Sequence, residues 1–146
     1  MGVRRFDHVG VVVDDIEAAA AFLEVLGFER EGSARLSGAW VDAVVGLDGI
    51  DSDIIMLRTP DGGGRIELSK FHAPADESAV RPEAANRLGI RHIAYEVDDL
   101  ESTLERIRAH GYDTVRDIVE YKDVYRLCFV RGPEGLIIEL TQPLRP

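Results

Sequence analysis

The sequence predicts an α+β fold made of two tandem βαβββ modules. When His92 is laid over His8, residues 92–101 repeat the pattern of residues 8–17. Near the end of each copy the tripeptide Ile-Glu-Leu recurs, at 66–68 and at 138–140. A repeat on this scale indicates a repeated supersecondary unit, so each copy is expected to fold as one module.

Each copy begins with a predicted strand. Residues 8–13 are rich in valine, and Val9, Val11 and Val13 alternate with other residues, which is typical of a strand with two different faces. Residues 92–97 repeat this pattern. Because one face is apolar, each strand is expected to pack against a helix.

A helix is expected directly after each of these strands. Asp14 and Asp98 stand in predicted cap positions, and each is followed three residues later by a glutamate, as in a capping box. Apolar residues then recur at helical spacing until Gly27 in the first copy and until Gly111 in the second. The glycines predict where the helices end.

Three strand-like segments follow each helix, which gives the order βαβββ twice. They are residues 28–35, 53–58 and 64–71 in the first copy, and 112–121, 125–131 and 136–141 in the second. The first copy also carries an insertion at residues 37–49, which could be a short helix or an irregular cover. Trp40 in this insertion could line a pocket or a subunit contact, or it could fill the core of its own module.

The two copies are expected to form a single domain over residues 1–146. The modules span about 4–71 and 90–142, joined by a linker at residues 72–89 that contains prolines and small residues without periodicity. A chain of this length can bury one core, or two small cores that share a face.

The composition disfavours several classes of protein. With 17 basic and 27 acidic residues the formal charge is −10, which disfavours nucleic acid as a partner. Apolar runs are shorter than a membrane span, and the N-terminal pattern lacks that of a secretory signal, so a cytoplasmic protein without a membrane partner is expected. The single cysteine, Cys128, lies in an apolar stretch and is expected to be buried rather than catalytic.

Four residues at matching places in the two copies are the candidate metal ligands: His8, Glu67, His92 and Glu139. Each is expected on the strand face opposite its apolar neighbours. A carboxylate among buried apolar residues requires a cation or a hydrogen-bonding group nearby. Two imidazoles and two carboxylates suit one six-coordinate divalent ion, such as Ni, Co, Mn, Fe(II) or Zn, with two positions left open. His72 and His110 lack this symmetry and are expected on the surface.

The paired modules and these four residues resemble the vicinal oxygen chelate superfamily, which includes glyoxalase I, methylmalonyl-CoA epimerase, extradiol dioxygenases and bleomycin-resistance proteins. Residues 89–99 and 135–140 carry the most specific part of the likeness. The resemblance implies a glyoxalase-like fold with a cupped mixed sheet in each module, commonly completed as a homodimer. It also implies a metal that chelates two neighbouring oxygens of a small-molecule substrate.

The resemblance further implies catalytic roles for two glutamates, with Glu139 as the ligand that shuttles a proton and Glu67 as its counterpart. The expected function is a divalent-metal-dependent isomerase or lyase of the glyoxalase or epimerase type, acting on a small molecule with adjacent oxygens. Two alternatives stay open: an Fe(II) ring-cleaving dioxygenase, and a non-catalytic sequestering or resistance protein. The second would bind an aromatic metabolite against Trp40, Phe71 and Tyr121.

Other residues bear on the substrate. Arg58, Arg126 and Tyr125 could contact an anion or line a pocket, or they could be solvated strand ends. At two positions where glyoxalase I usually carries residues that bind glutathione, this chain has Val12 and Phe71. This difference disfavours glutathione as the cosubstrate.

Overall fold

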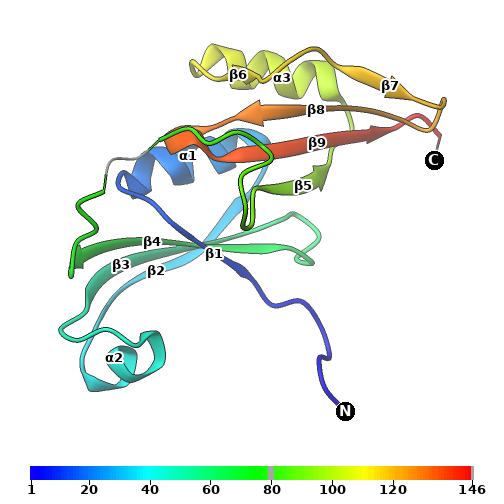
Figure 1. Ribbon diagram of the computed structural model, residues 1–146. Coiled ribbons are helices and arrows are strands. Elements are labelled where there is room, and N and C mark those ends of the chain that lie inside the picture. The colour runs from blue at the N-terminus through cyan, green and yellow to red at the C-terminus, as the bar shows by residue number, and fades with distance from the viewer. Residues whose placement is uncertain (79–80, 146) are drawn as a thin grey trace. The chain divides into compact units, whose positions relative to one another are not determined.

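The computed structural model describes residues 1–78 and 81–145 and divides into two compact units, Met1–Ala79 and Val80–Pro146. Each unit contains one cupped mixed sheet with a long helix packed against it (Figure 1). The predicted fold class, α+β with two tandem βαβββ modules, is confirmed. The boundary between the units falls inside the predicted linker at 72–89, of which residues 79 and 80 lie outside the described residues.

The first unit forms a four-stranded sheet in the order β1-β4-β3-β2. Its elements are β1 (Val9–Val12), α1 (Ile16–Leu26), β2 (Glu29–Ser37), α2 (Ala39–Val45), β3 (Asp51–Arg58) and β4 (Arg65–Ala73). β1 runs parallel to β4, while β4, β3 and β2 are antiparallel neighbours. The parallel pair therefore joins the start of the module to its end.

The second unit forms a five-stranded sheet in the order β5-β9-β8-β6, with β7 also paired to β8. Its elements are β5 (His92–Glu96), α3 (Leu100–Ala109), β6 (Asp113–Thr114), β7 (Val119–Tyr121), β8 (Tyr125–Arg131), the 3-10 turn η1 (Pro133–Gly135) and β9 (Ile137–Pro143). β5 and β9 are parallel, like β1 and β4. The strand pair that carries the candidate ligands is thus the same in both units.

Both long helices are capped by an aspartate, one residue later than the sequence predicts. Asp15 accepts a hydrogen bond from the backbone N–H of Ala18, and Asp99 accepts one from Ser102. The predicted cap Asp14 instead forms an ion pair with Lys70 of β4. A pair of adjacent aspartates offers two possible caps, and the start of the helix decides between them.

The predicted strand at 112–121 is interrupted. It forms the two short strands β6 and β7, which are separated by residues 115–118. Thr114 pairs with Val130 and Val119 pairs with Leu127, so four residues on one side oppose only two on β8. The two extra residues form a bulge, which bends a strand locally and ends regular pairing.

The insertion in the first module contains a short helix, α2, so the helical alternative is the correct one. Asp42 of α2 accepts hydrogen bonds from the backbone N–H groups of Gly49 and Ile50, which closes the insertion onto itself. Trp40 is 60% exposed and Val41 is buried. Trp40 therefore does not fill the core of its module.

Each sheet buries its core under the long helix. In the first module, α1 contributes Ala19, Ala20, Phe22 and Leu23, and the sheet contributes Ile55, Leu57, Ile66 and Leu68. In the second, the corresponding residues are Leu100, Leu104, Ile107, Cys128, Val130, Ile138 and Leu140. Each large apolar side chain buried in this way stabilises its module by about 1.5–3 kcal/mol. Cys128 is buried, as expected.

None of the helices among residues 1–78 and 81–145 is long and apolar enough to span a membrane.

Candidate metal centre

His8 and Glu67 lie next to each other at the parallel strand pair of the first module. Gly10 of β1 is opposite Glu67 of β4, and His8 directly precedes β1. The Nε2 atom of His8 is 3.8 Å from Oε2 of Glu67. Their side chains are 35% and 28% exposed, so a ligand can reach both.

Asp7 binds the other nitrogen of the His8 ring. The Nδ1 atom of His8 is 2.6 Å from Oδ2 of Asp7. A carboxylate can only accept a hydrogen bond, so Nδ1 of the neutral ring carries the hydrogen and the lone pair of Nε2 stays available beside Glu67. The same hydrogen bond lowers the pKa of Asp7 below its ordinary value. Asp7 therefore stays ionised and keeps the ring in the tautomer that a metal ligand needs.

Arg65 connects this aspartate to strand β2. Its Nη1 atom is 3.6 Å from Oδ2 of Asp7, and its Nη2 atom donates to Oε2 of Glu31 over 2.6 Å. Sequence reasoning missed these three residues because strand register, and not spacing along the chain, brings them together. The only available signal was an aspartate directly before the histidine.

His92 and Glu139 form the equivalent pair in the second module. Ala94 of β5 is opposite Glu139 of β9, and Nε2 of His92 is 3.2 Å from Oε2 of Glu139. Phe129 of β8 is opposite Glu139, and its ring centroid is 4.9 Å from that of His92. The apolar ring of Phe129 thus borders this pair, whereas the carboxylate of Asp7 borders the first pair.

The separation within each pair can be compared with that of two neighbouring ligands on one metal ion. Two donors about 2.1 Å from one ion, at right angles, lie about 3.0 Å apart. The 3.2 Å separation in the second pair is close to this value, and the 3.8 Å separation in the first pair is wider. The imidazole and carboxylate donors suit a divalent ion of borderline hardness. The structure brings the four predicted ligands together two by two, within each unit. In the part of the chain that the structure describes, no three His, Cys, Asp or Glu residues gather as one metal-binding group.

The remaining histidines have other partners. His72 lies at the far end of β4, where its Nε2 atom is 2.6 Å from Oδ2 of Asp53. Nδ1 of His110 donates to the backbone carbonyl of Arg106 at the end of α3. Both rings are exposed, as the sequence predicts.

Two of the three candidate substrate contacts are engaged elsewhere. Arg58 pairs with Glu29 across β2 and β3, and Arg126 pairs with Glu101 of α3. Tyr125 is different, because its ring lies parallel to that of Tyr121, with centroids 6.5 Å apart and 9° between the planes.

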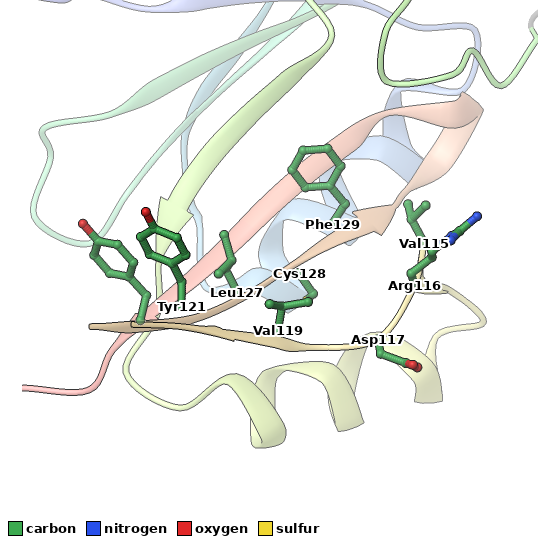
Figure 2. Close-up of a pocket in the computed structure, with 9 residues that line it drawn as sticks. Val115, Arg116, Asp117, Val119, Tyr121, Leu127, Cys128 and Phe129 are labelled. Carbon is green, nitrogen blue, oxygen red and sulfur yellow. The ribbon is translucent and has the colours of Figure 1, made fainter. Parts of the chain in front are cut away.

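These tyrosines line an open cavity of about 510 Å³ in the second module (Figure 2). The cavity is lined by Val115, Arg116, Asp117, Val119, Tyr121, Tyr125, Leu127, Cys128 and Phe129. Of these residues, the sequence singled out Tyr121 and Tyr125 as possible contacts of a ligand. For Leu127 and Phe129 the signal was their alternation with Tyr125, which places the three on one face of β8.

Several known proteins are similar to this chain along its length. The uncharacterized protein YaeR of Escherichia coli (strain K12) is 27% identical over 145 residues, which cover 97% of this chain and 98% of YaeR. A glyoxalase family protein from Bacillus cereus is 37% identical, and its crystal structure matches with a TM-score of 0.94 over 99% of this chain and 97% of that one. FosX, a fosfomycin resistance protein from Listeria monocytogenes, shares the fold with a TM-score of 0.64 at 16% identity, over 95% of this chain and 91% of FosX.

The likeness extends to a family. The sequence model of the Glyoxalase/Bleomycin resistance protein/Dioxygenase superfamily matches residues 5–140, a span that includes both modules and all four predicted ligands. The resemblance noted in the sequence is thereby confirmed. This chain belongs to the glyoxalase/bleomycin resistance protein/dioxygenase superfamily.

Proposed function

We propose that this protein is a divalent-metal-dependent isomerase or lyase of the glyoxalase or epimerase type, acting on a small molecule with adjacent oxygens. The observation that carries the proposal is the repeated pair: His8 with Glu67, and His92 with Glu139, at the same register of the same parallel strands. In this proposal the four residues hold one ion, which is Ni, Co, Mn, Fe(II) or Zn.

The donor chemistry supports a metal at these residues. Each pair joins a neutral imidazole nitrogen to a carboxylate oxygen, and four such donors leave two of six positions for a substrate. One crystal structure of FosX, which is 15% identical to this chain, is a complex with Mn(II) and sulfate. Such an ion, when bound, would polarise two adjacent oxygens of a substrate and acidify a neighbouring C–H bond.

Glu139 is the proposed acid and base. Its side chain is 20% exposed, and its neighbours Ile138 and Leu140 are fully buried on the other face of β9. Its carboxylate is therefore directed to the open face, where it can take a proton from a substrate carbon and return it. Glu67 is the proposed counterpart of Glu139, on the open face of the first module.

The setting of the enzyme is also part of the proposal. We propose a homodimer in the cytoplasm, in keeping with the family to which the chain belongs. The formal charge of −10 supports a small-molecule substrate over a polyanion such as nucleic acid. Val12 and Phe71, at the positions that glyoxalase I uses for glutathione, support a substrate without glutathione.

Elemental analysis of untagged protein tests the metal site. The wild type should retain about one divalent ion per chain, while His8→Ala and Glu139→Gln should retain clearly less. His72→Ala is the matched control, because this exposed histidine is also paired with a carboxylate but lies outside the site. No metal in the wild type, even after reconstitution with each of the five ions, would overturn the proposal.

Ligand binding and turnover separate the rival functions. Binding of an aromatic metabolite that needs no metal and survives Glu139→Gln would favour sequestration. Opening of an aromatic diol ring, with Fe(II) and oxygen, would favour a dioxygenase. Loss of turnover in Glu139→Gln that is not restored when the variant is saturated with metal would support the proposed role of this glutamate.

A further inference from the structure

Phe129 links the cavity of the second module to the His92–Glu139 pair. Phe129 belongs to both: it lines the cavity, its ring contacts that of His92, and it is the strand partner of Glu139. Leu127 and Tyr125 follow on the same face of β8. A molecule held at the metal pair would therefore extend along this row of side chains.

The bulge between β6 and β7 provides the space. The backbone N–H of Val115 still donates to the carbonyl of Phe129 over 2.7 Å, but regular pairing resumes only at Val119 and Leu127. Figure 2 shows the bulge residues Val115, Arg116 and Asp117 at one end of the cavity and Tyr121 at the other. The cavity is therefore formed by the strands β7 and β8 and by the bulge between β6 and β7.

The lining of the cavity is mostly apolar, and two of its aromatic rings are parallel. Val119 and Tyr121 are 58% and 50% exposed, so large apolar surfaces that would be favourable to bury are open to water. The rings of Tyr121 and Tyr125 are parallel to within 9°, so a planar ring can stack against a ring face here. Among the residues that line the cavity, the charged ones are Arg116 and Asp117, which belong to the bulge.

We infer that this cavity binds a flat aromatic substituent of the substrate, while the adjacent oxygens of the same molecule are held at the His92–Glu139 pair. The inference rests on the proposed function and names its substrate class, an aromatic compound with two neighbouring oxygens. A volume of about 510 Å³ is within the range of small-molecule sites. Phe129, which lines the cavity and contacts the His92 ring, places it beside the ligand pair and favours a substrate over a protein partner.

Three hydroxamates test this inference. Acetohydroxamate, cyclohexanecarbohydroxamate and benzohydroxamate all chelate metals through two adjacent oxygens and differ only in the attached group. Their dissociation constants are measured on the metal-loaded wild type and divided by their values for the free ion. After this correction benzohydroxamate should bind at least about tenfold more tightly than acetohydroxamate, because the ring is removed from water. It should also bind more tightly than the cyclohexane compound.

Two variants at exposed positions of β7 should remove the preference for benzohydroxamate over acetohydroxamate. Val119→Asp puts a carboxylate beside Leu127, and Tyr121→Ala removes one of the parallel rings. Both should bring benzohydroxamate close to acetohydroxamate and leave the affinity for acetohydroxamate unchanged. Val44→Asp is the control, because Val44 is a 78% exposed valine on α2, outside the cavity.

The outcomes distinguish the two proposals. If metal-loaded protein cannot be obtained, or does not bind acetohydroxamate, the proposed metal site fails. If all three compounds bind equally well after correction, the metal site stands and the cavity inference is wrong. Equal affinity for the cyclohexane and benzene compounds would overturn the assignment of an aromatic group.

Discussion

The two modules place a histidine and a glutamate at the same points of the same strand pair, in different surroundings. Gly10 is opposite Glu67 in the first module, and Ala94 is opposite Glu139 in the second. The small residue two positions after each histidine leaves room in front of the ring. The backbone repeat is therefore sufficient to set up both ligand pairs.

The neighbours of the pairs have diverged. Asp7 precedes His8 and binds its ring, whereas Arg91 precedes His92. Met56 is the strand partner of Glu67, and Phe129 is that of Glu139. The first pair thus has a charged support that suits holding a metal, and the second has an apolar wall that suits contacting a substrate. The difference teaches that the repeat fixes where the candidate ligands stand, while the residues around them are set separately in each module.

The largest predicted effect is on stability. It tests whether the cores of the two modules are packed equally well, as their matching backbones suggest. Leu68 and Leu140 follow the two glutamates and are both fully buried. Leu68→Ala and Leu140→Ala should each lower the free energy of unfolding by about 2–5 kcal/mol, because each leaves a cavity under its helix. Urea unfolding measures the loss, with the exposed Val44→Ala as control. A loss below 1 kcal/mol in only one variant would mean that the module concerned is loosely packed.

Cys128 provides the next test of the core of the second module. It is opposite Leu140, as Ile55 is opposite Leu68, so a cysteine stands where the first module has an isoleucine. Burial raises the pKa of its thiol to about 11. At pH 8 the reactive thiolate should be about a hundredfold scarcer than in the unfolded chain. Labelling with a thiol reagent should therefore be at least that much slower in native protein than in guanidinium; equal rates would show that β8 opens.

Asp7 and Arg91 allow a direct comparison of the two histidine supports. Asp7→Ala should weaken metal binding roughly 10–100-fold, because the lost hydrogen bond no longer fixes the His8 ring. Arg91→Ala, the matched change in the second module, should alter it much less. Competition with a chelator of known affinity measures both. Equal effects of the two changes would contradict the asymmetry between the modules.

The sequence was sufficient for the parts of the fold that repeat. The recurring His and Ile-Glu-Leu patterns predicted the strands that carry the candidate ligands and the open face on which these residues lie, because side chains alternate strictly along a strand. The helices were also predicted, although Asp14 was preferred to Asp15 as the cap. That one-residue error arose because both aspartates have the right chemistry and only the backbone angles separate them.

The features that differ between the modules could not be predicted. The bulge at residues 115–118 depends on how β6 and β7 pair with β8, and a segment read alone does not contain this register. The contact of Arg65 with both Glu31 and Asp7 likewise requires three separate elements to be in place. The cavity follows from the bulge, so its lining was recognised only in part.

The smallest predicted effect concerns ion pairs of the first sheet. Arg35 of β2 donates two hydrogen bonds of 2.7 Å to Asp51 of β3, which lowers the pKa of Asp51 below its ordinary value of 3.8. A lowered pKa in the folded state means that this pair stabilises the fold above about pH 4. The stabilisation is lost as the pH falls through the lower folded value. Both side chains are substantially exposed, so the contribution is small and screened by salt.

Asp51→Asn should therefore reduce the loss of stability between pH 5 and pH 3 at low ionic strength, as measured by urea midpoints, and it should have little effect in high salt. Asp48→Asn is the control, since it makes the same change of net charge at an exposed bend near α2. In the second module, β7 pairs with β8 through Val119 with Leu127, Glu120 with Arg126 and Tyr121 with Tyr125, and the ion pair of Arg126 is with Glu101 of α3. A similar pair in the second module, Arg108 with Asp113, lies at β6 and not at β7. Hydrogen exchange at pH 4 should therefore report faster opening of β2 than of β7. The reverse order would indicate that the apolar edge beside the cavity, and not the charged edge, is the weaker part of the protein.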